Sequence, residues 1–315
     1  MRRTSQFLFL GFMTFAAVLH QIRGGGPQGT APVDALCPFG GIEALYKLLA
    51  YGEFLKRTNT SNLVLLAGVV IMALVAGKSF CSWICPLGTL QEWLGSVGKR
   101  LFGRTFHLPG PVHRILSKLK YVVLALVLAF TWYTGDLIFR AYDPWVAYAH
   151  LYNGVAGVFE EYPFALILLG LTLLLALFTD RPWCRYACPL GALLEILGRL
   201  GLVRLRINED TCLNCNRCSK ACSQKLKGGA AECNGCADCV SACPVPGTLR
   251  FTAGKRVVAP LMVGVITLGI FLGTYGVAKA AGIWNSKGSG TAGKKNVSAV
   301  LPVTEQESQT QTLTR

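Results

Sequence analysis

The sequence has little charge for its length. Of its 315 residues, 15% are charged and 52% are hydrophobic, whereas about 25% of the residues in a soluble domain are charged. This scarcity argues against a soluble protein and favours a membrane protein. The net charge of +15 would favour a nucleic-acid partner in a soluble protein, but in a membrane protein it is typical of Lys and Arg in cytoplasmic loops. We therefore expect a membrane, and no nucleic acid, among the partners.

The sequence also lacks the motifs of several redox cofactors. It contains no C-x-x-C-H motif for covalent haem. The segment Gly24–Pro27 follows an apolar helical run and lacks the glycine spacing of a dinucleotide-binding loop. Cysteine, in contrast, is abundant at 13 residues. Disulfide frameworks belong to short secreted chains, so the spacing of these cysteines decides their chemistry.

Five apolar runs are candidate membrane spans: Phe7–Ile22, Leu63–Phe80, Tyr121–Phe139, Tyr162–Phe178 and Val257–Ala278. A spanning helix needs about 20 residues, so the third and fifth runs qualify outright and the others are at the lower limit. The first run has no small-residue cleavage site after it, which favours an uncleaved span. Aromatic residues beside the outer connection are predicted to form an interfacial belt: Trp132, Tyr133, Trp145 and Tyr148.

The distribution of charge predicts the orientation. Residues 78–120 contain seven Lys or Arg and one acid, residues 180–256 contain twelve and six, and residues 136–161 contain one Arg and four acids. Basic connections stay in the cytoplasm, so residues 136–161 are expected on the outer side. The polar segment 280–315 is expected to be a disordered tail.

Eight cysteines form two copies of the spacing C-x2-C-x2-C-x3-C. The copies are Cys212, Cys215, Cys218 and Cys222, and then Cys233, Cys236, Cys239 and Cys243, the last followed by Pro244. In bacterial ferredoxins, three closely spaced thiolates bind one cluster and the fourth binds the other cluster. We therefore predict two [4Fe–4S] clusters. Cluster 1 is assigned Cys212, Cys215, Cys218 and Cys243, and cluster 2 is assigned Cys222, Cys233, Cys236 and Cys239. A pair of zinc sites is the alternative, which two complete four-cysteine runs disfavour.

A second cysteine motif, C-x3-C-P, occurs twice, 103 residues apart. Cys81, Cys85 and Pro86 match Cys184, Cys188 and Pro189, and the sequences after the prolines also agree.

This repeat predicts two related transmembrane hairpins. The two cysteines of each copy share one helix face, and a new helix is expected to start at the proline. Three interpretations stay open: one metal or cluster site formed by all four thiols, a dithiol relay, or small buried residues.

Cys37 and Pro38 form a shortened third copy with no second cysteine, because position 33 is Val. A shared helix start explains this copy better than a redox or quinone-contact role for Cys37.

On these motifs the chain resembles the NapH family of membrane ferredoxin-type proteins, to which NosR, MauN and CcoG are related. The resemblance covers residues 1–255 and implies four transmembrane helices, two C-x3-C-P motifs and a carboxyl-terminal dicluster ferredoxin. It also implies quinol oxidation or electron delivery at a bacterial inner membrane. The fifth apolar run and the polar tail depart from that layout.

We therefore expect a mostly α-helical polytopic membrane protein with a small α+β ferredoxin domain inserted before the last span. The expected domains are a membrane domain (1–200), a ferredoxin domain (201–256), a carboxyl-terminal transmembrane helix (257–279) and the tail (280–315). The ferredoxin domain is expected on the cytoplasmic side of a bacterial inner membrane.

The expected function is electron transfer between the quinol pool and a redox partner such as a reductase, a cytochrome or a second ferredoxin subunit. The expected cofactors are the two clusters, a quinone and a further metal or cluster at the C-x3-C-P motifs. One alternative is a maturation factor that reduces a metal or cofactor for another enzyme, and a redox sensor is a third, less favoured one.

Overall fold

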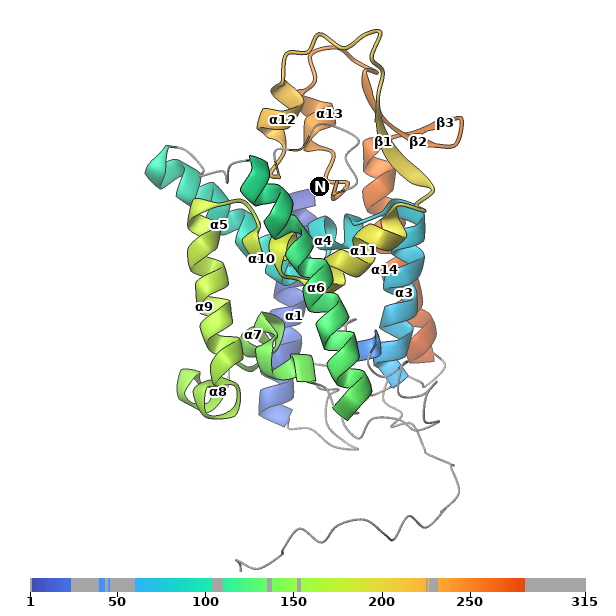
Figure 1. Cartoon of the computed structure of the whole chain (residues 1–315). Coiled ribbons are helices and arrows are strands. Elements are labelled where there is room, and N and C mark those ends of the chain that lie inside the picture. The colour runs from blue at the N-terminus through green and yellow to red at the C-terminus, as the bar shows by residue number, and fades with distance from the viewer. Residues whose placement is uncertain are drawn as a thin grey trace, which may run out of the picture.

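The computed structural model describes residues 2–23, 40–42, 45, 60–103, 110–134, 138–151, 154–224, 226 and 232–280. Cys37 and residues 281–315 lie outside the described residues. Within the described part, a bundle of helices has one small antiparallel sheet at one end (Figure 1). The expectation of a mostly helical protein with a small α+β segment near the carboxyl end is confirmed at this level.

Among the described residues, five helices run along the bundle: α1 (Arg2–Arg23), α3 (Thr60–Ala76), α6 (Gly110–Thr134), α9 (Pro163–Phe178) and α14 (Pro260–Ala280) (Figure 1). Two of their segments, Pro111–Thr134 and Pro260–Val277, are long and apolar enough to cross a membrane. These correspond to the third and fifth apolar runs. Helix α14 begins at Pro260, three residues after the run begins, because Val257 and Val258 belong to a strand.

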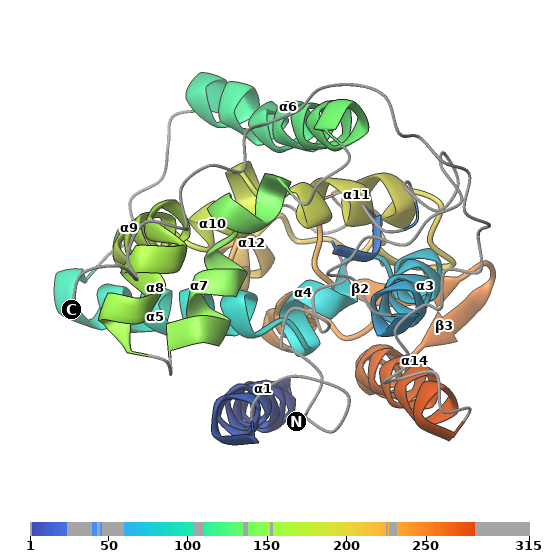
Figure 2. The ribbon, with the colours of Figure 1, turned by 90° about the horizontal axis from the view of Figure 1, so that it is seen from below.

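The repeat in the sequence is also a repeat of structure. In the first half, α3 is followed by the short helix α4 (Ser79–Trp83) and then by α5 (Pro86–Phe102). In the second half, α9, α10 (Pro182–Tyr186) and α11 (Pro189–Gly198) each begin 103 residues after their counterparts. Seen from below, α1 and α6 lie on opposite sides of the bundle, with α4 and α10 between them (Figure 2).

The two halves interlock through the last helix of each repeat, α5 and α11. Helix α5 packs on α9 of the other half, and α11 packs on α3. Glycine makes the first contact possible, because a Cβ atom at Gly98 would lie 1.8 Å from the carbonyl oxygen of Leu177. In the second contact, the backbone N–H of Leu202 donates to the carbonyl of Leu74 at 2.9 Å. Each half is therefore completed by a helix from the other.

The connection between the halves folds back into the bundle. It comprises a 3-10 helix, η2 (Ile138–Tyr142), followed by α7 (Pro144–His150) and α8 (Val155–Glu161). The side chain of Asp143 caps α7 by accepting from the backbone N–H of Trp145 at 3.0 Å.

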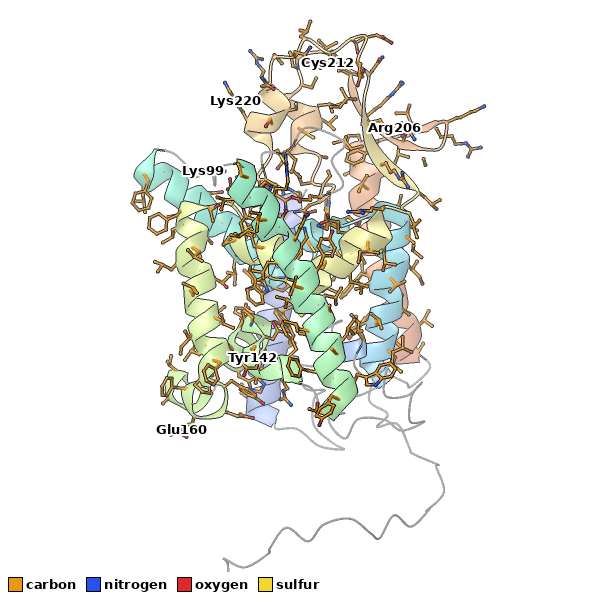
Figure 3. The ribbon with its side chains drawn as sticks, viewed as in Figure 1. Lys99, Tyr142, Glu160, Arg206, Cys212 and Lys220 are labelled. Carbon is orange, nitrogen blue, oxygen red and sulfur yellow. The ribbon has the colours of Figure 1, made fainter. Side chains whose placement is uncertain are left out.

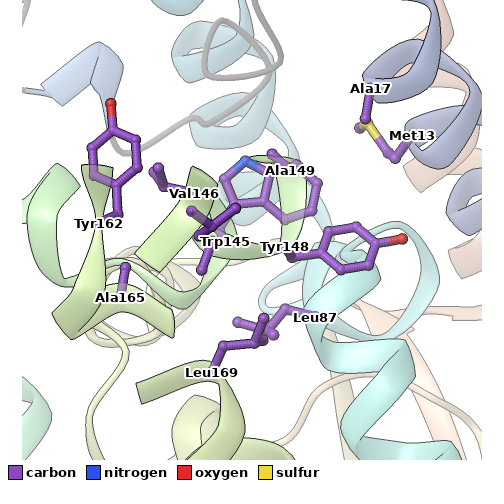
Figure 4. Close-up of a cluster of buried hydrophobic side chains, with 12 residues drawn as sticks. Met13, Ala17, Leu87, Trp145, Val146, Tyr148, Ala149, Tyr162, Ala165 and Leu169 are labelled. Carbon is purple, nitrogen blue, oxygen red and sulfur yellow. The ribbon is translucent and has the colours of Figure 1, made fainter. Parts of the chain in front are cut away.

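The four aromatic residues of the predicted interfacial belt fall into two pairs. Trp132 and Tyr133 are exposed, but Trp145 and Tyr148 are buried. The latter two pack among side chains of α1, α5 and α9, including Met13 and Leu169 (Figure 4). The prediction for Trp145 and Tyr148 was wrong because these aromatic residues lie on a short helix that is enclosed by the bundle.

The carboxyl-terminal cysteines belong to a small layer at one end of the bundle. Its elements are β1 (Val203–Ile207), α12 (Arg217–Ala221), α13 (Asp238–Ala242), β2 (Leu249–Ala253) and β3 (Arg256–Val258). The strands pair antiparallel in the order β1-β2-β3. Buried Leu205 and Phe251 fix the sheet on Val263 of α14. Figure 3 shows Lys99, Arg206 and Lys220 at this end of the molecule and Glu160 at the other.

The Gly98 contact predicts a strong dependence of stability on that glycine. Replacing Gly98 by Ala should destabilise the protein by at least about 2 kcal/mol, because the new methyl group would force two backbones apart. Gly170→Ala is the matched control, since no atom lies within 4 Å of the added Cβ and Ala is favoured over Gly in a helix by about 1 kcal/mol. Thermal unfolding in detergent checks both variants, and equal stability of the two would contradict the interlock.

Candidate iron–sulfur centres

Each C-x3-C-P motif breaks a helix at its second cysteine. Cys85 (φ −62°, ψ 116°) and Cys188 (φ −67°, ψ 115°) have nearly the same extended backbone, and the following proline starts the next helix. A residue before proline avoids the α-helical region, which explains the break. The helix restart at proline was expected from the sequence. The first and second cysteines of a motif, however, do not share one continuous helix.

The structure brings all four C-x3-C-P thiols together. Cys188 lies close enough to Cys184, Cys81 and Cys85 to interact electrostatically with all three. Cys184 also acts on Cys81 and Cys85. The four thiols come from two motifs that are 103 residues apart, and they meet where the halves interlock. Of the three interpretations left open by the sequence, the geometry therefore favours a shared site.

Donors are already directed at these sulfur atoms. The side-chain amide of Gln91 donates to Sγ of Cys184 at 3.3 Å, and the backbone N–H of Gly191 donates to Sγ of Cys188 at 3.3 Å. The backbone N–H of Gly88 makes the equivalent contact with Cys85. Hydrogen bonds to sulfur stabilise the thiolate form and tune iron–sulfur clusters, so this environment suits charged thiolates.

Two buried ion pairs cross between the halves. Lys78 lies three residues before the first motif and pairs with Glu195 of α11, while Arg181 lies three residues before the second and pairs with Glu92 of α5. The two cations are 103 residues apart, and so are the two carboxylates. Arg181 is fully buried and also donates to the carbonyl oxygen of Cys81 at 3.0 Å. The ion pairs thus repeat the internal symmetry and fasten each motif to the opposite half.

Each carboxylate has further partners. Glu195 accepts from Nζ of Lys120 at 2.7 Å and from the hydroxyl of Tyr121 at 2.8 Å. Burial by itself would raise the pKa of Glu195, but Lys78 and these donors outweigh it and lower the pKa to about 2. Glu195 is therefore ionised at neutral pH, and two buried ammonium groups share one carboxylate.

The second carboxylate joins the bundle to the cysteine-rich layer. Glu92 accepts from Arg181, from Arg2 at 2.7 Å and from Gln6 at 3.0 Å. Arg2 also reaches Asp238 of α13 at 2.8 Å. The amino terminus of α1 therefore lies on the same side of the molecule as the carboxyl-terminal cysteines.

The structure places the cysteines of predicted cluster 1 around one hollow. Cys212, Cys215, Cys218 and Cys243 all line it, together with Leu213 and Pro244. Cys215 is exposed, and Cys212 lies at the end of the layer away from the bundle (Figure 3). These four cysteines form the outer cysteine set.

The cysteines of predicted cluster 2 form an inner set. Burial and the neighbouring thiols of Cys236, Cys233 and Cys222 raise the pKa of Cys239 to about 12. Cys222 also acts on Cys233 and Cys236. Neutral thiols gathered so closely lose their protons when a metal binds, which fits iron ligation.

The two cysteine loops have matching backbones. The residue before the second cysteine is left-handed in both, Asn214 (φ 50°) and Gly235 (φ 62°), and so is the residue after it, Asn216 (φ 55°) and Ala237 (φ 69°). Left-handed alanine is rare and costs free energy. Its presence indicates a loop that is held in shape for a function.

The inner cysteine loop rests directly on the first C-x3-C-P motif. The hydroxyl of Ser82 donates to the carbonyl oxygen of Asn234 at 2.7 Å, and the indole of Trp83 donates to the carbonyl oxygen of Gly235 at 3.3 Å. Trp83 fits because α14 has a glycine beside it: a Cβ at Gly264 would lie 2.3 Å from the ring. Both donors are the variable residues of the motif itself, so the motif and the inner set form one continuous structure.

These features define a class: a helical bundle of membrane type that carries cysteines arranged as in iron–sulfur proteins. The family described as "4Fe-4S binding domain" matches residues 58–105 and 162–208. Both matched segments contain a C-x3-C-P motif, and neither reaches Cys212. No solved structure matches the chain.

Three similar proteins have names that refer to electron transport or to ferredoxin. YccM of Escherichia coli (strain K12), whose name assigns it to electron transport, is 32% identical over 294 residues, which cover 87% of this chain and 79% of YccM. The ferredoxin-type protein NapH of the same organism is 31% identical over 59% of this chain and 56% of NapH. The methylamine utilization ferredoxin-type protein MauN of Methylobacillus flagellatus is 27% identical over 59% of this chain and 60% of MauN.

The chain belongs to the family of ferredoxin-type membrane electron-transport proteins. The resemblance to the NapH family is thereby confirmed. The protein is an iron–sulfur electron-transport protein related to NapH and NosR.

Sequence reasoning missed the charged residues of the site. Lys78, Arg181, Glu92 and Glu195 repeat at the same 103-residue offset as the cysteines. That offset was a usable signal, because a cation and a carboxylate that both recur around a motif are expected to have equivalent positions. The signal gives no indication that the pairs cross between the halves.

Removing the carboxylate of Glu195 should destabilise the fold strongly. Glu195→Gln would leave Lys78 and Lys120 without their shared counter-charge, and breaking a buried pair costs about 3–5 kcal/mol. Glu209→Gln, at an exposed turn, is the control and should change the free energy of unfolding by less than about 0.5 kcal/mol. Unfolding of both purified variants is the measurement. A Glu195→Gln protein as stable as the control would show that the buried pair is not needed.

Proposed function

We propose that the protein passes electrons between the membrane quinol pool and a partner redox enzyme. Two [4Fe–4S] clusters would be held by the inner and outer cysteine sets, and a third by the four C-x3-C-P thiols. When bound, these clusters supply one-electron transfer. The observation that carries the proposal is the direct contact between the first C-x3-C-P motif and the inner loop, through Ser82 and Trp83.

The third cluster is supported by three independent features. The four thiols are mutual neighbours, donors reach their sulfur atoms, and the buried cations Lys78 and Arg181 act on them. A buried positive charge is stabilised by a negative group nearby. A cluster with four thiolates is negatively charged and supplies that group.

A cavity at the junction suits a quinol headgroup. It has a volume of about 240 Å³ and lies where α3 ends, between that helix, β1 and the inner loop. Cys233 lines it together with Val203, Phe251 and Lys78. Pockets for drug-sized molecules are larger, about 300–1,000 Å³, so a single ring fits better than a nucleotide cofactor. Its mixed apolar and cationic lining suits a ring that releases protons on oxidation.

The proposed orientation follows from charge. The end that carries Lys99, Arg206 and Lys220 would face the cytoplasm, and the end with Glu160 would face outward (Figure 3). The chain would be a multi-pass protein of a bacterial inner membrane. The outer cysteine set is then open to a protein partner in the cytoplasm.

Iron analysis tests the cluster count. Wild-type protein purified without oxygen should contain roughly twelve irons per chain, four for each cluster. Cys85→Ser and Cys188→Ser should each contain about eight, and so should Cys215→Ser, because each variant loses one ligand of one cluster. About eight irons in the wild type, unchanged in Cys85→Ser, would show that the C-x3-C-P thiols bind no cluster.

Quinol kinetics test the cavity. Val203→Trp fills it and should raise the KM for a short-chain quinol about tenfold or more, measured as anaerobic bleaching of the clusters. Leu202→Trp, an exposed neighbour that does not line the cavity, should behave like the wild type. Dithionite should bleach all three proteins equally. A wild type that no quinol reduces would refute the quinol function, and equal KM values would refute only the cavity.

A further inference from the structure

Two buried cations lie near both the C-x3-C-P thiols and the inner cysteine set. Lys78 lines one cavity together with Cys233 and interacts electrostatically with Cys81, Cys184 and Cys233. Arg181 donates to the carbonyl oxygen of Cys81 at 3.0 Å and interacts electrostatically with Cys184 and Cys236. Lys78 is 5% exposed and Arg181 is fully buried. Each cation therefore faces sulfur atoms of two different sets.

The positions of these cations are fixed more strongly than packing requires. Each is held by a carboxylate from the opposite half, Glu195 for Lys78 and Glu92 for Arg181. Arg181 also has a left-handed backbone (φ 51°), which is unusual for a residue other than glycine. Strain of this kind occurs where a function requires one position of a side chain.

The electrostatics of reduction give the cations a role. A [4Fe–4S] cluster gains one negative charge on reduction, and its potential depends on nearby charge and on burial. A fixed positive charge in a buried site stabilises the reduced form more than it would in water. One cation between two clusters therefore raises the potential of both.

We propose that Lys78 and Arg181 are a matched pair of charge-compensating residues that raise the reduction potentials of the C-x3-C-P cluster and of the inner cluster together. The inference rests on the proposed clusters. Because the pair raises both potentials, it changes the driving force for electron transfer between these two clusters less than a cation beside only one of them would. The outer cysteine set has neither cation among the residues that line its hollow, so its potential should be independent of them.

The experiment is an EPR-monitored redox titration of the whole protein. Lys78→Met should shift the midpoint potentials of the C-x3-C-P and inner clusters to more negative values and leave the outer cluster unchanged. Lys78→Arg keeps the charge and should retain the wild-type potentials. Lys120→Met is the matched control: it breaks the same Glu195 triad but removes a charge that is not among the main electrostatic influences on Cys81, Cys184 and Cys233.

The potentials and the iron content of these variants together decide whether the proposal holds. Wild-type potentials in iron-replete Lys78→Met, or an equal shift in Lys120→Met, would overturn the proposal. If Lys78→Met binds less iron while Lys78→Arg and Lys120→Met bind the full amount, the charge is required for cluster binding and the proposal is supported. If Lys78→Arg also loses iron, the role is one of shape and the proposal fails.

Arg181, the residue equivalent to Lys78 in the second half, gives a second test. The proposed function can fail separately from this inference. Arg181→Gln should shift the same two potentials in the same direction, and unchanged potentials would count against the pair. If the wild type shows only two clusters, the proposed third cluster is wrong. The inner cluster, which both cations face through Cys233 and Cys236, then still reports whether they set its potential.

Discussion

Two crossed ion pairs constrain the rest of the structure. Lys78 with Glu195 and Arg181 with Glu92 join the two halves of the chain through largely buried side chains. Buried charges are stable only when they are paired closely, so these four residues fix how the halves meet. That arrangement sets the four C-x3-C-P thiols around one place and leaves positive charge beside them. The two C-x3-C-P motifs and these four charged residues therefore form one arrangement with internal symmetry.

The inner cysteine loop extends this arrangement toward the surface. Ser82 and Trp83, inside the first motif, bind the backbone of the loop, and Arg2 ties α1 to Asp238 of the same layer. The cysteine sets thus follow one another from the buried interface to the inner loop and then to the outer hollow with its exposed Cys215. An electron carrier between a membrane and a soluble partner needs such an order, with one end enclosed and the other accessible.

The sequence was sufficient for features that depend on local spacing. The two ferredoxin-type runs, the helix restarts at Pro86 and Pro189, and the two longest spans all follow from short-range rules. It was insufficient where distant segments meet, because Lys78 and Glu195 are 117 residues apart and no local pattern pairs them. The burial of Trp145 was missed for the same reason: a short helix can lie at the membrane interface or inside the bundle, and only tertiary packing decides.

We propose that thiols from both halves bind one iron–sulfur cluster at their interface. Anomalous diffraction at the iron edge, on crystals grown without oxygen, tests this most directly. We expect three iron peaks, one of them bounded by Cys81, Cys85, Cys184 and Cys188. Two peaks, confined to the cysteines from Cys212 to Cys243, would contradict it.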